Sequence, residues 1–107
     1  MRESELVNAG LQELLLAGIP AWRVNSGAFK AGTRFIRMTS VNGVSDIIGC
    51  LPPNGRLLAA EAKVNKNKPS EDQEKFLAAI EKAGGLAVVF YSVEELMDAI
   101  EPEKANG

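Results

Sequence analysis

A strong turn signal at residues 52–55 constrains the fold more than any other feature of the sequence. Pro52-Pro53-Asn54-Gly55 joins two prolines to an Asn-Gly pair, a composition typical of tight turns. Strand-like runs flank the turn at residues 45–51 and 57–63. Because the connection is so short, we expect the two runs to pair as an antiparallel hairpin.

The first third of the chain predicts one helix and two strands. Apolar residues at helical spacing indicate a helix over residues 4–17, with Ser4 as its cap, and Gly18 and Pro20 end it. Residues 21–25 and 34–38 alternate in character and are predicted as strands. Residues 30–32 between them are predicted as loop.

The C-terminal part predicts a helix, a strand and a second helix. Ser70 begins the first of these helices, with Gln73 in capping-box position. The apolar run 86–91 predicts a strand covered on both faces, reached from the fourth strand by a parallel crossover. Ser92 begins a last short helix, whose apolar face is formed by Leu96, Met97 and Ile100.

These elements predict an α/β fold with a mixed central sheet flanked by helices. The chain has 107 residues, which suffices for one hydrophobic core. We therefore expect a single domain over residues 1–101 and a flexible tail over 102–107.

Composition excludes several classes of protein. Histidine is absent, which excludes mechanisms that need imidazole, and the single cysteine excludes an intrachain disulfide and a cysteine-rich zinc site. No apolar run approaches the roughly 20 residues of a membrane span, and acidic residues stand where a signal peptide carries positive charge. We expect a cytoplasmic protein.

The net charge of −2 conceals an uneven distribution. Residues 14–68 contain eight basic and two acidic side chains, whereas residues 69–107 contain three basic and nine acidic ones. Such asymmetry can mark a surface that binds a polyanion, although scattered solvated side chains would give the same count.

The only two acids in the basic stretch, Asp46 and Glu61, lie at matching ends of the predicted hairpin. Glu61 and Lys63 share one face of their strand because side chains alternate along it. Two carboxylates brought together repel each other unless a cation lies between them, and oxygen ligands favour Mg²⁺ or Mn²⁺. Taken singly, each residue also fits a structural role, as an exposed ion pair or a turn acid.

The joint pattern resembles the virus-type replication-repair nuclease (VRR-NUC) domain of the PD-(D/E)xK nuclease superfamily. The resemblance extends from Glu5 to about Leu96. It rests on segments 22–27, 43–46, 61–63, 70–73 and 84–89, which read WRVNSG, GVSD, EAK, SEDQ and GGLAVV.

The resemblance implies a restriction-endonuclease-like fold and a set of site residues. Asp46, Glu61 and the backbone carbonyl of Ala62 would bind Mg²⁺ or Mn²⁺, and Lys63 would orient or deprotonate the attacking water. Gln73 would hold Lys63 or the phosphate. Of the acids in the first helix, Glu5 is favoured over Glu3 and Glu13 as the residue that reaches the metal. The residues expected to contact DNA are Arg23, Asn25, Ser26, Lys30, Arg34, Arg37, Lys66 and Lys68.

The implied activity is metal-dependent, structure-selective endonuclease cleavage of DNA. Standalone members of phage type resemble dimeric junction resolvases, so we expect a phage- or prophage-encoded homodimer that nicks branched DNA, with a four-way junction as the leading substrate and flaps second. Phe29, Ile36, Met38 and Val41 are candidates for the dimer face, with packing in the core as the alternative that we favour for at least half of them. The alternatives are an inactive nucleic-acid-binding module on a nuclease fold and an interaction protein in which Glu61 and Lys63 form a structural pair.

Overall fold

The computed structural model comprises three helices and six strands within the residues that it describes, which are 1–24, 28–31, 34–37 and 42–106. For residues 28–31, 34–37 and 102–106 it describes the backbone alone. The elements are α1 (Glu3–Leu16), β1 (Ala21–Arg23), β2 (Ala28–Ala31), β3 (Arg34–Arg37), β4 (Ile47–Leu51), β5 (Arg56–Ala62), α2 (Glu71–Lys82), β6 (Leu86–Phe90) and α3 (Val93–Asn106).

The predicted hairpin forms the centre of a four-stranded mixed sheet. The strand order is β1-β4-β5-β6, with β4 antiparallel to β1 and β5 and with β5 parallel to β6. The turn joins β4 to β5 in a register that places Ile47 opposite Ala60 and Leu51 opposite Arg56. The hairpin, the parallel crossover through α2 and the α/β class are therefore confirmed.

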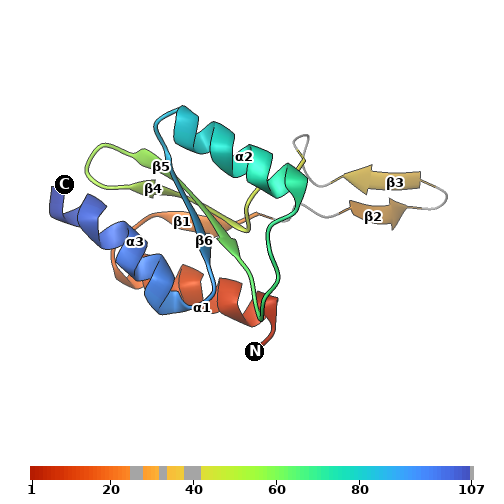
Figure 1. Cartoon of the computed structure of the whole chain (residues 1–107), viewed down its shortest axis with the longest axis horizontal. Helices are drawn as coiled ribbons and strands as arrows, with labels where there is room; N and C mark the ends of the chain where they lie inside the picture. The colour runs from red at the N-terminus through yellow and green to blue at the C-terminus, as the bar shows by residue number, and fades with distance from the viewer. Residues whose placement is uncertain (25–27, 32–33, 38–41, 107) are drawn as a thin grey trace.

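Helices cover the two faces of this sheet unequally (Figure 1). On one face, α1 and α3 contact each other and the sheet, and they enclose the main core. On the other face, α2 contacts β6 and β5. The main core combines alternate residues of β4, β5 and β6 with the inner residues of α1 and α3, including Leu6, Leu14, Leu58, Phe90 and Leu96.

Side-chain caps determine where the helices begin. Ser70 Oγ accepts the Gln73 N–H (3.2 Å) and Gln73 Oε1 accepts the Ser70 N–H (2.8 Å), which confirms the predicted capping box of α2. The prediction that Ser4 caps α1 was wrong. Arg2 is the N-cap, and its N–H donates to Glu5 Oε1 (3.0 Å), so the helix begins one residue before Ser4.

Two further boundaries differ from the prediction. Residues 30–32 were predicted as loop, but β2 includes Lys30 and Ala31 and pairs with β3 in a separate two-stranded sheet. Lys30 is paired with Phe35 in that register. Such pairing depends on contacts in three dimensions, which the short sequence 30–32 does not reveal. At the C-terminus, α3 continues through Pro102 to Asn106, since a proline removes one backbone donor without always ending a helix.

Within the part of the chain that the structure describes, none of the helices combines the length and the apolar character that a bilayer crossing requires.

Candidate metal centre

The β4–β5 hairpin brings Asp46 and Glu61 into direct contact. Asp46 immediately precedes β4, and Glu61 is the second-last residue of β5. The Asp46 N–H donates to Glu61 Oε1 (3.2 Å), and the Ala62 N–H donates to Asp46 Oδ2 (2.9 Å). The backbone of each strand thus holds the carboxylate of the other, so both side chains are oriented by the hairpin itself.

A third carboxylate comes from the start of α1, and it belongs to Glu3. Carboxylate oxygens of Glu3, Asp46 and Glu61 lie within 4.8 Å of one another. Glu5, which the sequence favoured, instead binds the Arg2 N–H (3.0 Å) and pairs with the Arg2 guanidinium (3.5 Å). The structure thus brings Glu3 to the cluster in place of the expected Glu5, and a metal-binding role for Glu5 stays a prediction. Its position three residues after the N-cap engages Glu5 in the cap and leaves Glu3 to face the sheet.

Lys63 lies beside this cluster of three carboxylates. Its Nζ is 3.4 Å from Glu61 Oε2 and 4.0 Å from Glu3 Oε1, and only 11% of its side chain is exposed. The Lys63 N–H donates to the Phe90 carbonyl (3.0 Å), which fixes the backbone just beyond β5. The predicted proximity of Glu61 and Lys63 on one face is confirmed.

Gln73 joins the site from the first turn of α2, with a partner other than the predicted one. Its Nε2 donates to Glu61 Oε2 (2.9 Å), while its Oε1 is used in the cap. We expected Gln73 to hold Lys63 or a phosphate. Because both polar atoms of its amide are engaged, Gln73 connects the start of α2 to the Glu61 carboxylate.

Burial and a neighbouring charge raise the proton affinity of Glu61. Its pKa is raised from 4.5 to about 7, first because burial disfavours the charged carboxylate and second because Asp46 repels it. Lys63 acts in the opposite direction and lowers the pKa. A carboxylate with these surroundings gains from any further positive charge placed between it and Asp46.

The segment before Asp46 packs closely against the start of α2. Gly43 has φ +74°, and a Cβ at this position would lie 2.3 Å from the backbone of Asp72. Glycine is therefore required at position 43 for two reasons, which are the positive φ and the close contact with the backbone of α2. Ser45 is fully buried and donates its hydroxyl to the Ile47 carbonyl (3.0 Å), so the segment enters β4 in one defined conformation.

The donor set fits a hard divalent cation. It offers carboxylate oxygens from three separate elements, and Mg²⁺ and Mn²⁺ bind such oxygens while retaining several waters. The three residues differ in exposure, with Glu61 1% exposed and Glu3 and Asp46 partly exposed, so the cluster is open on one side. Ala62 contributes its N–H to Asp46, and the role of its carbonyl as a ligand stays a prediction.

The expected DNA-binding residues are only partly placed by the structure. Arg23 is exposed at the end of β1, where its Nη1 donates to Asn8 Oδ1 (3.2 Å). Lys66 and Lys68 are exposed in the loop after β5, on the far side of the sheet from β1. Other residues predicted to bind DNA or to form the dimer face lie outside the described residues or have only their backbone described; these are Asn25, Ser26, Phe29, Lys30, Arg34, Ile36, Arg37, Met38 and Val41.

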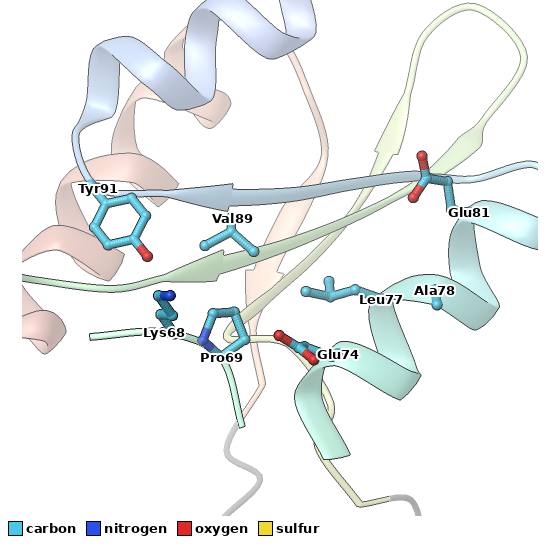
Figure 2. A pocket seen from close by; sticks show the side chains of 8 residues that line it. All are labelled: Lys68, Pro69, Glu74, Leu77, Ala78, Glu81, Val89 and Tyr91. Carbon is cyan, nitrogen blue, oxygen red and sulfur yellow. The ribbon is translucent and has the colours of Figure 1, made fainter. Parts of the chain in front are cut away.

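Lys68 lies in a shallow groove between α2 and β6. The groove has a volume of about 500 Å³, and Figure 2 shows Lys68 and Pro69 beside Tyr91 at one end and Glu81 at the other. Its floor is apolar, formed by Leu77, Ala78 and Val89. The Tyr91 hydroxyl donates to the Asn67 carbonyl (2.7 Å), which holds the loop against the strand.

Comparison with known proteins adds no relative to this description. The chain matches no known family model, and it matches no curated protein.

Proposed function

We propose that the protein is a Mg²⁺- or Mn²⁺-dependent nuclease that hydrolyses phosphodiester bonds in DNA, of the PD-(D/E)xK type. One observation carries this proposal: a buried glutamate and an aspartate face each other across a hairpin, with a lysine two residues after the glutamate and 3.4 Å from it. Burying one carboxylate against a second is unfavourable, because the two charges repel each other.

A divalent cation bound by Asp46, Glu61 and Glu3 would neutralise phosphate charge and make a water molecule more acidic. Lys63, next to Glu61, is positioned to orient that water or to stabilise the charge that develops on the phosphate. Gln73 keeps the Glu61 carboxylate in place through its amide. The hydrogen bond from Ala62 does the same for Asp46.

The charge pattern supports DNA as the substrate. The basic stretch 14–68 contains both Asp46 and Glu61, and phosphate contacts by Lys and Arg are independent of the nucleotide sequence. We further propose a cytoplasmic homodimer, because a two-fold axis would place two such sites on two strands of a junction. A four-way junction is the leading substrate and a flap the second.

Cleavage of a substrate panel tests this function. Single strand, duplex, flap and four-way junction are each incubated with Mg²⁺, Mn²⁺ or EDTA. We expect cleavage of the branched forms with either metal and none in EDTA. Asp46→Ala and Lys63→Ala should abolish cleavage, whereas Glu13→Ala, an exposed acid elsewhere on α1, should not. Cleavage that survives both site substitutions would refute the assignment.

A metal-independent nucleic-acid-binding module is the second candidate. It is favoured by the fact that Glu61 already has Asp46, Gln73 and Lys63 as partners, so the buried carboxylate is satisfied by protein groups. This candidate predicts salt-dependent DNA binding that neither metal nor Asp46→Ala changes. Metal binding by wild-type protein in calorimetry, lost in Asp46→Ala, would exclude it.

A further inference from the structure

Half of one sheet face is left without a helix in the described part of the chain. Side chains of β4 alternate between the core under α1 and α3, which takes Ile47 and Leu51, and the opposite face, which takes Ile48 and Cys50. On that opposite face α2 contacts β6 and β5, at the other edge of the sheet from β1. Ile48 and Cys50 are only partly buried, as expected for strands that no helix covers.

Trp22 lies on this uncovered half. It is paired with Ile48 in the β1–β4 register and is 50% exposed, among the few large exposed apolar side chains of the described residues. Its neighbours Ala21 and Arg23 are directed to the other face, where Ala21 packs on the core and Arg23 bonds to Asn8 of α1. An indole half-exposed on an edge strand offers a flat aromatic surface to solvent.

The indole and the metal centre lie on the same face of the sheet. Trp22 is opposite Ile48, Ile48 is opposite Ala59, and Glu61 follows Ala59 by two residues on the same face. From the spacing of strands and residues, Trp22 and Glu61 are ~12 Å apart at the backbone. At the rise of about 3.4 Å per nucleotide in a stacked strand, this distance corresponds to three or four nucleotides, and to fewer in an extended one.

The sequence that follows Trp22 is basic. Arg23 follows it directly, and the chain then contains Lys30, Arg34 and Arg37 before the next acid, which is Asp46 itself. The Val24 N–H donates to the Asp46 carbonyl (2.8 Å), so this basic segment leaves and rejoins the sheet at the metal centre. Proteins that bind unpaired nucleotides combine an exposed aromatic side chain with basic residues.

We propose that Trp22 is a stacking platform for an unpaired base of the strand that occupies the metal centre, and that the substrate is therefore nucleic acid with unpaired nucleotides within a few positions of the bond that is cut. Among the branched forms, this favours a flap, which has an unpaired strand, over a four-way junction, whose arms are fully paired. This inference rests on the proposed function for the identity of that strand. It adds that fully paired duplex cannot use the platform, because its bases are stacked on each other.

Intrinsic fluorescence tests the stacking directly, since Trp22 is the only tryptophan of the chain. The full-length protein is titrated in EDTA with a short oligothymidylate and with a duplex of equal length. We expect the single strand to quench the fluorescence of Trp22, and we expect most of this fluorescence to remain when the duplex is added. In anisotropy titrations with labelled oligonucleotides, Trp22→Ala should bind the single strand about tenfold to a hundredfold more weakly and the duplex within about twofold of wild type.

Two further variants make the result specific. Trp22→Phe retains a stacking surface and should keep most of the single-strand affinity. Leu16→Ala removes another exposed apolar side chain, at the end of α1, and should change neither affinity. Far-ultraviolet circular dichroism confirms that each variant is folded.

The outcomes separate this inference from the proposed function. Quenching together with the selective loss in Trp22→Ala supports the platform even if no substrate is cut, in which case the nuclease assignment alone fails. Equal single-strand affinities of Trp22→Ala and wild type overturn the platform, even if cleavage depends on Asp46. A shift of the Trp22 emission maximum when the protein is diluted without nucleic acid would show that a second copy covers Trp22. That result would also overturn the platform.

Discussion

Glu61 makes the stability of the metal-free protein depend on pH in an unusual direction. Its pKa is raised from 4.5 to about 7, so between these values the folded chain binds a proton that the unfolded chain releases. The free energy of unfolding therefore falls as the pH rises from 4.5 to about 7 and is level beyond. At 1.36 kcal/mol per pH unit, this shift corresponds to a loss of roughly 3 kcal/mol between pH 4.5 and neutrality, the net effect of burial, Asp46 and Lys63.

Glu61→Gln removes the titration while retaining an oxygen that can accept the Asp46 N–H. Urea unfolding in EDTA at pH 5, 6, 7 and 8 compares the two proteins. We expect wild type to lose stability relative to Glu61→Gln across this range, with most of the change below about pH 7. A difference between the two proteins that stays constant from pH 5 to pH 8 would refute the reasoning. Mg²⁺ should reduce the wild-type loss, because it binds the charged form.

Three further predictions concern metal binding, close packing and helix capping. Binding of Mg²⁺ at pH 6 should release up to about one proton from Glu61, so that the calorimetric heat depends on the ionisation enthalpy of the buffer; identical heats in two such buffers would contradict this. Gly43→Ala should lower the free energy of unfolding by more than Gly18→Ala does, because both glycines have positive φ but only Gly43 lies against another backbone; equal losses in urea unfolding would argue against the clash. Ser70→Ala should cost about 1 kcal/mol in the same assay through loss of the α2 cap, and no measurable loss would show that the cap contributes little.

Local patterns were sufficient for most of the sheet and for three members of the site. The turn at 52–55 and the alternation of β5 predicted that Asp46 and Glu61 meet and that Lys63 follows on the same face. The capping box predicted the start of α2. These features depend on neighbouring residues or on one hairpin, so the sequence contains their cause.

The remaining members of the site depend on how distant elements pack. Glu3 reaches the cluster because α1 begins at Glu3, one residue before the predicted start, and because Glu5 is engaged in the cap. Arg2 is not a usual N-cap residue, since its side chain cannot accept a hydrogen bond, so the sequence held no clear signal for this start. The hydrogen bond between Gln73 and Glu61 requires α2 to lie beside β5. The periodicity of neither segment shows where the two elements lie relative to each other. The strand β2 was missed because its pairing with β3 is visible only in three dimensions.

The site takes its three carboxylates from the beginning of α1 and from the β4–β5 hairpin, and the Gln73 amide that holds Glu61 comes from the beginning of α2. Long stretches of chain separate these segments. No fragment that ends before α2 contains the complete arrangement, and none that lacks the first few residues does. During synthesis, then, the site can be assembled only after most of the chain has left the ribosome. Affinity for the cation would therefore report whether folding is complete. A chain that is clipped or partly folded would lose this affinity while it still retained much of its secondary structure.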